Sequence, residues 1–359
     1  MRIAFIGAKG INARYNGGGV EISLREIAKR LADKGHQVVI YCRKPREIAL
    51  VDNLAKNIKI IYLPTLHSKH LGTLLHVFLS AILVLFSDAD IVHFQSLGPS
   101  VFSFLPRLCG KKTIVTIHAL DWKRKKWGCM ARLFLKLCQY PAMFFPHKTT
   151  VVSKTLKAYF EGKFKRKVYY IPNGVNPPAL GKPSPEKDQY ILFVGRLVPE
   201  KGIHYLIQAF NGLNTDFKLL IAGEPSFTNN YFNYLKKIAN QKISFIGFAD
   251  NSYLEKLYQN AYLFVLPSEI EGLSVALLEA MSHGRCVLTS NIPEFLEVTG
   301  GNGIYFKTGD CLDLRNKLRY LMDNPDLVRE RGLAFRKLAL ERYGWDKIIE
   351  EIEKVYAQG

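Results

Sequence analysis

Residues 268–293 read SEIEGLSVALLEAMSHGRCVLTSNIP, and this stretch places two carboxylates around the start of a predicted helix. Glu271 precedes the turn Gly272-Leu273-Ser274, and Glu279 lies inside the apolar run 274–283. Eight residues at helical rise would separate the carboxylates by roughly 12 Å. A helix N-terminus presents free amides and a positive dipole end, which suits a diphosphate. The stretch therefore predicts a nucleotide-diphosphate sugar at the amides of residues 272–274, with Glu271 on the sugar and Glu279 on the ribose.

These two residues also have a simpler interpretation, because acidic residues in a first turn often only favour the helix dipole. A second segment favours the binding site. Strand-like residues 190–194 lead into GRLVPEKG at 195–202, where Gly195 lets the backbone turn. Arg196 can bind phosphate through its planar fork, and Lys201 adds a compact charge to the same anion. Two cations after one strand and two carboxylates after another predict a diphosphate-sugar site.

GRLVPEKG followed by EGLSVALLEAM resembles the donor-site signature of retaining glycosyltransferase family 4, which has the GT-B fold. The resemblance extends over nearly the whole chain and includes the hinge IPNGV at 171–175 and YGW at 343–345. The segments TIHALDWKRKKWG and GINARYNGGGVE are similar to the bacterial polysaccharide branch that contains rhamnosyltransferases. The resemblance implies a dTDP-rhamnose donor, with UDP- or GDP-hexoses close behind, and a bacterial glycan acceptor, often lipid-linked.

The resemblance also implies the chemistry. Negative charge builds on the β-phosphate oxygen as the glycosidic bond breaks, and Arg196, Lys201 and helix amides would stabilise it. No Asp-x-Asp pair follows a predicted strand to hold a divalent cation. We therefore expect no metal and no cofactor besides the donor, and retention through same-face attack. Arg196, Lys201 and Glu271 are the predicted catalytic residues on this side of the site.

Four further residues are predicted on the resemblance. His118 ends the strand 112–117, and the family places a histidine there near the reaction centre, where it could donate a hydrogen bond to a sugar hydroxyl. Gly18 and Gly19 belong to a glycine-rich loop before a predicted helix at 20–32, which suits a phosphate or sugar but could also be a plain loop. Phe248 ends the segment Ile246-Gly247-Phe248, which resembles the family segment whose backbone meets the nucleobase.

Short β-branched runs alternate with longer amphipathic stretches, the pattern of parallel α/β domains. The sequence predicts a GT-B architecture, two doubly wound Rossmann-like domains facing a central cleft. The N-terminal, acceptor-side domain is residues 1–172, with a last helix at about 345–359 packing back on it, and the nucleotide-sugar domain is 173–344. Predicted strands are 2–6, 37–42, 58–62, 91–94, 112–117, 149–152, 168–171, 190–194, 217–222, 243–246, 263–266, 286–289 and 303–305.

The excess of positive over negative charge lies entirely in the first half of the chain. Residues 1–172 hold 29 Lys and Arg against 9 Asp and Glu, whereas residues 173–359 hold 21 against 22. The densest clusters, 123–126 and 163–167, have aromatic neighbours. Such a face can bind anionic lipid at about 1 kcal/mol per cation. We expect a peripheral position on the cytoplasmic face of the plasma membrane, and no nucleic acid, because no recognition motif accompanies the charge.

Two apolar runs bear on the membrane. Residues 71–86 are short of the roughly 20 needed to cross a bilayer and predict a buried crossover helix. Residues 130–145 predict a helix packed in the domain, with a membrane-interface helix as the alternative.

Six cysteines show no CxxC or metal spacing and read as reduced thiols, mostly in the core. Residues 2–6 read as a strand followed by Gly7, not as a secretory signal.

Two other functions remain open at this point. A non-catalytic sugar-nucleotide-binding protein would have the same binding residues without turnover. An NADP-dependent oxidoreductase is conceivable because Arg43, after the second strand, could meet a 2′-phosphate. However, the loop after the first strand lacks GxGxxG spacing, and an oxidoreductase does not account for Arg196, Lys201, Glu271 and Glu279.

Overall fold

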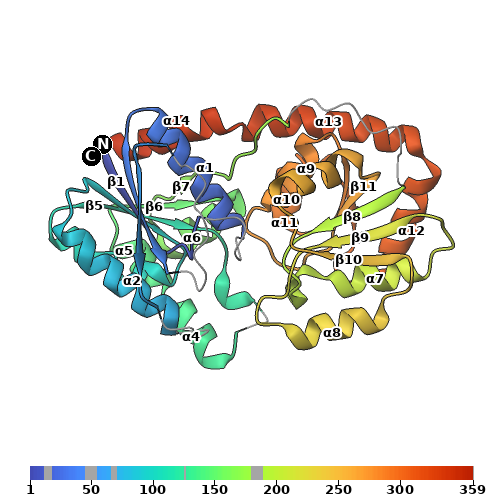
Figure 1. Ribbon diagram of the computed structural model, residues 1–359, viewed down its shortest axis with the longest axis horizontal. Helices are drawn as coiled ribbons and strands as arrows, with labels where there is room; N and C mark the ends of the chain where they lie inside the picture. Colours follow the sequence, from blue (N-terminus) through green and yellow to red (C-terminus); the bar gives the residue numbers. More distant parts are fainter. Residues whose placement is uncertain (12–17, 45–54, 66–70, 125–126, 179–188, 359) are drawn as a thin grey trace. The chain divides into compact units, whose positions relative to one another are not determined.

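The computed structural model describes residues 1–11, 18–44, 55–65, 71–124, 127–178 and 189–358 (Figure 1). The chain forms two compact units. Unit 1 comprises Met1–Asn173 and Trp345–Gly359, and unit 2 comprises Gly174–Gly344. Each unit contains one parallel sheet with helices between most successive strands of the described chain, which confirms the predicted class of two doubly wound α/β domains.

The sheet of unit 1 has the strand order β3-β2-β1-β4-β5-β6-β7, and all of its neighbours are parallel. The order reverses between β1 and β4, and ligands of doubly wound sheets bind at the carboxyl ends of strands beside such a point. The strands are β1 (Arg2–Ile6), β2 (Gln37–Arg43), β3 (Ile58–Leu63), β4 (Ile91–Gln95), β5 (Lys112–Ile117), β6 (Lys148–Val151) and β7 (Tyr169–Tyr170).

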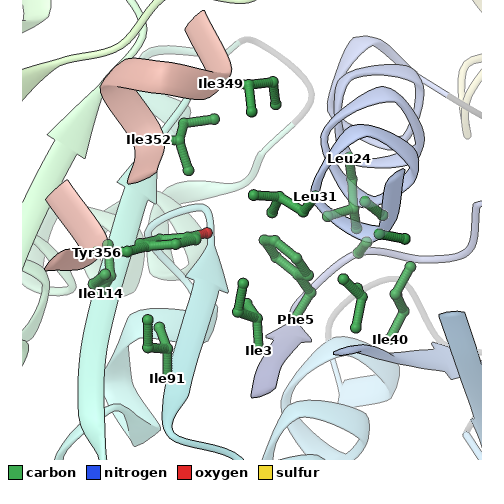
Figure 2. Packing of buried hydrophobic residues seen from close by; sticks show 14 of the residues in the cluster. Ile3, Phe5, Leu24, Leu31, Ile40, Ile91, Ile114, Ile349, Ile352 and Tyr356 are labelled. Carbon is green, nitrogen blue, oxygen red and sulfur yellow. The ribbon is translucent and has the colours of Figure 1, made fainter. Parts of the chain in front are cut away.

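Helices α1 and α14 share one hydrophobic core with the sheet of unit 1. Alternate residues of β1, Ile3 and Phe5, pack there with Leu24 of α1 and with Ile352 of α14 (Figure 2). The last helix therefore belongs to the first unit. The helical segments are α1 (Gly19–Asp33), α2 (Leu71–Leu83), η1 (Val84–Phe86), η2 (Pro99–Phe102), α3 (Phe104–Leu108), η3 (Asp121–Lys123), α4 (Cys129–Leu137), α5 (Gln139–Phe144), α6 (Lys154–Phe164) and α14 (Trp345–Ala357).

The sheet of unit 2 repeats this topology in the order β10-β9-β8-β11-β12-β13, so its order reverses between β8 and β11. Its strands are β8 (Tyr190–Val194), β9 (Lys218–Ala222), β10 (Ile243–Gly247), β11 (Leu263–Leu266), β12 (Cys286–Ser290) and β13 (Ile304–Phe306). Its helical segments are η4 (Pro199–Lys201), α7 (Ile203–Asn211), α8 (Asn229–Ile238), α9 (Asn251–Asn260), α10 (Val275–Ser282), α11 (Pro293–Val298), α12 (Cys311–Asp323) and α13 (Pro325–Tyr343).

Each predicted strand is present, with ends that differ by at most one residue, but three predictions about helices and thiols need correction. The run 130–145 is not one packed helix, because it is divided at Cys138 into α4 and α5, and none of the nine residues of α4 is buried. The run 71–86 forms the predicted crossover helix between β3 and β4, but it is buried only in part, since Phe78 and Phe86 are exposed. Of the six free cysteines only Cys42, Cys138 and Cys286 are buried. Among the described helices, none has both the length and the apolar character to cross a bilayer.

Candidate functional site

The loops after β8 and β11 lie side by side at the reversal point of the sheet in unit 2. The Glu269 amide donates to the Glu200 carbonyl at 2.9 Å and ties the two loops together. Gly202 has φ +67°, and a Cβ there would lie 2.0 Å from the Pro267 carbonyl oxygen. Only glycine permits this conformation and this approach. The last glycine of GRLVPEKG therefore brings the residue before it, Lys201, up to the β11 loop.

Lys201 and Glu271 form an ion pair across this point. The Lys201 ammonium contacts Glu271 Oε1, and the two side chains are only 14% and 11% exposed. The Ser268 hydroxyl donates to the same carboxylate oxygen at 2.8 Å. Ser290 of β12 donates in turn to the Ser268 carbonyl and supports the turn. A cation and a carboxylate from two predicted motifs thus lie together, held by neighbours that exclude most water.

The predicted anion cradle before α10 is placed slightly differently from the expectation. Ser274 is the N-cap of α10, and its hydroxyl accepts from the Leu277 amide at 3.4 Å. Serine favours this capping role with extended backbone angles, so the helix begins at Val275 and not at residue 274. Gly272, Leu273 and Ser274 therefore form a buried turn before the first helical turn.

Glu279 lies in the middle of α10 and is half-buried, so it is not the solvated surface charge of the simpler interpretation. The Tyr258 hydroxyl of α9 donates to Glu279 Oε2 at 3.0 Å. Burial and the adjacent carboxylate raise the pKa of Tyr258 well above its usual value, so the phenol stays protonated and remains a donor. The Tyr258 ring stacks on His283, whose pKa is lowered to about 4 by burial and by Arg285.

Other predicted residues of unit 2 follow neighbouring strands. Arg196 follows β8 and is half-buried. Phe248 follows β10 and is 41% exposed. Gly223, at the end of β9 between them, has φ +139°, and a Cβ there would lie 1.9 Å from the Gly195 carbonyl oxygen. The strand ends of β8, β9 and β10 thus form one edge on which Arg196 and Phe248 lie.

Glu200, which directly precedes Lys201, has an unusual environment. It is 3% exposed, and neither carboxylate oxygen has a hydrogen-bond partner among the described residues. A buried carboxylate without donors is costly. Among the residues that the structure describes, no group of three or more His, Cys, Asp or Glu side chains is arranged to hold a metal ion.

In unit 1, His118 lies just beyond the carboxyl end of β5 and is oriented by Gln95 of the adjacent strand β4. The two side chains share a hydrogen bond of 2.8 Å between His118 Nε2 and Gln95 Oε1. Burial lowers the pKa of His118 to about 4, so the ring is neutral at pH 7. Because the Oε1 acceptor requires the proton on Nε2, Nδ1 has the lone pair. His118 can therefore accept a hydrogen bond from a hydroxyl, whereas the sequence suggested that it would donate one.

The glycine-rich loop of unit 1 ends at the start of α1. Gly18 is the N-cap, and Gly19 is the first helical residue. The Gly18 amide donates to Glu21 Oε2 at 2.9 Å, and the Lys9 amide donates to Glu21 Oε1 at 3.4 Å. The Gly18 amide is therefore already bonded to Glu21, although the sequence predicted that this loop binds a ligand. Gly17, also part of this prediction, lies outside the described residues.

An apolar and basic surface extends over α4, α5 and α6 of unit 1. Helical spacing puts four apolar residues of α4 on one face, and all four are exposed: Met130, Leu133, Phe134 and Leu137. Exposed Tyr140 and Phe144 of α5 continue this face. The Lys163 ammonium lies 5.6 Å from the Tyr140 ring centre, and the Arg166 guanidinium lies 5.0 Å from that of Phe144. We call these six apolar residues and the cations Arg132, Lys136, Lys163 and Arg166 the α4–α6 surface.

Comparison with known proteins identifies the family. Residues 17–178 match the family described as Glycosyltransferase Family 4, and residues 181–337 match Glycosyl transferases group 1. The chain is a GT-B glycosyltransferase. The NADP-dependent oxidoreductase suggested by Arg43 is set aside, because both matched families transfer sugars.

Three relatives illustrate the range of this glycosyltransferase's similarities. An uncharacterised glycosyltransferase of Methanocaldococcus jannaschii is 25% identical and covers 95% of each chain. A phosphatidyl-myo-inositol mannosyltransferase of Mycobacterium leprae is 24% identical over 94% of this chain and 92% of its own. A D-rhamnosyltransferase of Pseudomonas aeruginosa is 24% identical over 68% of each.

Solved structures show the same fold. Sucrose-phosphate synthase from Thermosynechococcus elongatus superimposes with a TM-score of 0.83 at 20% identity and covers 99% of this chain and 98% of its own. Anabaena HepE in complex with UDP-glucose has a TM-score of 0.80 at 17% identity and covers 99% of both chains. The glycosyltransferase thus has the GT-B fold.

Several residues that support the predicted ones were missed in the sequence. Ser268 lies three residues before Glu271, so a turn that returns its hydroxyl to the carboxylate could have been proposed. Tyr258 and Gln95 gave no such signal, because each is 20 or more residues from its partner. Lys125 and Lys126, counted in the predicted basic cluster, lie outside the described residues.

Proposed function

We propose that this glycosyltransferase transfers rhamnose from dTDP-rhamnose, with retention, to a lipid-linked acceptor of a bacterial polysaccharide. The similarity to a D-rhamnosyltransferase and to a phosphatidyl-myo-inositol mannosyltransferase supports a deoxyhexose donor and a lipid-borne acceptor. UDP- and GDP-hexoses are the competing donors. No divalent metal is required in this proposal, because cationic side chains and backbone amides neutralise the diphosphate.

The ion pair of Lys201 with Glu271 at the reversal point of unit 2 is the observation that supports the mechanism. Lys201 and Arg196 would hold the diphosphate and stabilise the charge that develops on the β-phosphate oxygen. Glu271 would accept from sugar hydroxyls. Glu279, oriented by Tyr258, would accept from the ribose hydroxyls.

The transfer itself breaks the bond between the anomeric carbon and the β-phosphate oxygen. The acceptor hydroxyl forms the new bond to the same face of the anomeric carbon. Its proton passes to the departing phosphate oxygen, so no protein base is consumed. His118 would accept a hydrogen bond from a donor-sugar hydroxyl through Nδ1 and fix the sugar during this step.

Nucleotide selectivity tests the donor. Thermal unfolding is measured with dTDP, UDP, GDP and ADP, and a nucleotide at about 100 times its Kd should add about 2.7 kcal/mol to the free energy of unfolding. We expect the largest shift with dTDP, and release of rhamnose from dTDP-rhamnose that persists in EDTA. A larger shift with UDP or GDP would mean that the donor carries that nucleotide and not dTDP. Loss of turnover in EDTA would reject the metal-independent mechanism.

We further propose that the α4–α6 surface binds the anionic cytoplasmic leaflet. Its exposed apolar face is flanked by cations, the composition of a helix that lies in a membrane interface. The excess of Lys and Arg in residues 1–172 adds attraction to anionic lipid. This arrangement would bring unit 1 to a lipid-linked acceptor.

Sedimentation with phosphatidylglycerol vesicles tests this second proposal. The wild-type protein should pellet at low salt and less at high salt. Leu133→Ser with Leu137→Ser should reduce pelleting strongly, whereas Leu333→Ser, at an exposed position of α13 in unit 2, should not. Equal pelleting of all three proteins would reject the assignment of the surface.

A further inference from the structure

A wide, open pocket of about 320 Å³ lies on the surface of the loop that joins β9 to α8 in unit 2. Phe227, Thr228, Asn229 and Asn230 line it. The loop follows Gly223, so the pocket lies at the same sheet edge as Arg196 and Phe248. Neither of the family motifs quoted above includes these four residues.

Phe227 is exposed in a way that hydrophobic packing does not explain. It is 70% exposed, and its φ of +58° is in the left-handed region that phenylalanine rarely adopts. Surrounding bonds hold this conformation: the Thr228 hydroxyl donates to the Leu197 carbonyl at 2.7 Å and accepts from the Ser226 amide at 3.2 Å. The Leu197 amide donates to the Glu224 carbonyl at 2.9 Å. The aromatic ring is thus presented to solvent by a loop fixed to the residue after Arg196.

The rest of the lining is polar and uncharged. Asn229 and Asn230 are exposed, and within the described ranges their carboxamides make no hydrogen bond. Each carboxamide offers two donors and one acceptor oxygen. An aromatic face with free amides and no charge matches a molecule that has an apolar face and a rim of hydroxyls. A pyranose has both, since its axial hydrogens present a C–H face to the ring. The pocket is open, so the pyranose would contact the protein on one face only.

We propose that Phe227, Asn229 and Asn230 form a binding subsite for one uncharged pyranose unit, with Phe227 as the stacking platform. The inference rests on the proposed function, because the pyranose is either the donor's sugar or the terminal sugar of the acceptor. Stacking on Phe227 and hydrogen bonds from the two carboxamides would fix its orientation next to the segment that carries Arg196.

Direct binding of saccharides to the full chain tests the subsite without requiring turnover. Saturation-transfer NMR is recorded with methyl α-L-rhamnopyranoside, methyl α-D-glucopyranoside and methyl α-D-mannopyranoside. We expect binding of at least one, weakened about tenfold in Phe227→Gly and in Asn229→Ala with Asn230→Ala. Phe227→Tyr should retain wild-type binding. Tyr320→Ala, which removes an exposed aromatic ring from α12, should also bind normally.

Thermal stability separates this role from a structural one. Glycine adopts φ +58° without strain, so Phe227→Gly should melt no lower than the wild-type protein while it binds saccharide less tightly. A lower melting temperature with unchanged saccharide binding would reject the subsite. Absence of binding of all three glycosides to the wild-type protein would reject it as well.

Kinetics then identify which sugar occupies the subsite. If Phe227→Gly raises the KM for dTDP-rhamnose hydrolysis without acceptor, the donor sugar lies there. If only the KM for a saccharide acceptor rises, the acceptor lies there, and if neither changes the subsite is refuted. Should the wild-type protein turn over no sugar nucleotide, the proposed function fails, and the NMR measurement still decides whether the subsite exists.

Discussion

The pairing of Lys201 with Glu271 leads to a residue-scale test that separates stability from function. Lys201→Ala leaves a largely buried carboxylate without its cation and should cost about 3 kcal/mol of unfolding free energy. Lys201→Met with Glu271→Gln removes both charges and should regain most of that stability. Neither protein should transfer sugar, because the diphosphate has lost its ammonium. Urea unfolding and a transfer assay on the same preparations provide the measurement.

Single substitutions test the roles of Lys201 and Glu271 separately. Glu271→Gln keeps the shape of the side chain and an acceptor oxygen for Ser268. We expect a folded protein with transfer reduced by at least about a hundredfold. Near-normal turnover in Glu271→Gln or in Lys201→Ala would remove these residues from the mechanism.

Tyr258 provides a second residue-scale prediction, for nucleotide binding. Tyr258→Phe removes the donor to Glu279 Oε2 and should raise the Kd for the nucleotide diphosphate about fivefold, the value of one hydrogen bond of about 1 kcal/mol. Tyr262→Phe is the matched control, since its hydroxyl donates to the Leu321 carbonyl and not to Glu279. Calorimetric titration of both variants is the measurement. An equal rise in Kd for the control would mean that the effect is one of general stability.

At this scale the sequence points to candidate charged residues more readily than to the side chains that orient them. Arg196, Lys201 and Glu271 stand out because each lies next to a glycine within a short motif. Tyr258 and Gln95 could not, because a side chain that orients a functional group is chosen by the packing of another element. The hydrogen-bond direction of His118 likewise depends on Gln95, which is 23 residues away.

At the element scale, the position of the loop after β8 depends on Gly202. Gly202→Ala would place a Cβ against the Pro267 carbonyl and force a residue with φ +67° into strain. We expect a loss of about 2 kcal/mol or more and a loss of transfer, because Lys201 moves away from Glu271. Gly212→Ala is the control: φ there is −88°, and the Cβ would meet only the end of the flexible Arg315 side chain. Equal losses from both changes would contradict this account.

Helix α4 shows where element-scale prediction from sequence reaches its limit. The spacing of Met130, Leu133, Phe134 and Leu137 predicts a helix with one apolar face, and the helix is present. Whether another element covers that face depends on tertiary contacts that periodicity does not encode. The favoured packed helix was therefore wrong, while the alternative of a membrane-interface helix remains as the basis of the α4–α6 surface.

For the whole molecule, alternation of strands and helices was enough to predict two doubly wound units, since parallel sheets need helical crossovers. The buried polar relay of unit 1 could not be predicted, because it joins four elements. In the arrangement that uses every contact, Thr150 donates to the Val115 carbonyl and accepts from Thr116. Thr116 accepts from His93 Nε2, so His93 Nδ1 accepts from the Tyr356 hydroxyl of α14. A neutral His93 thus joins the last helix to the sheet.

This relay and its neighbours predict that acid destabilises unit 1 before unit 2. In unit 1, burial lowers the pKa of His93 to about 3 and those of His76 and His118 to about 4, and it also lowers the pKa of His147. In unit 2, burial lowers the pKa of His283 to about 4. Below pH 6.5 these histidines bind protons in the unfolded chain but stay neutral in the folded protein. The free energy of unfolding is therefore unaffected by these histidines above pH 6.5, and it falls as the pH drops toward 4. At pH 5 the loss should be about 2 kcal/mol for His93 alone.

Tryptophan fluorescence can follow this difference, because Trp122, Trp127 and Trp345 all belong to unit 1. Urea midpoints from fluorescence should fall more steeply between pH 6.5 and 5 than those from far-ultraviolet circular dichroism, which reports both units. His93→Gln can still accept from Tyr356 and donate to Thr116 but does not titrate, so it should flatten the fluorescence dependence. Parallel loss in both signals, or an unchanged slope in His93→Gln, would show that the acid sensitivity arises elsewhere.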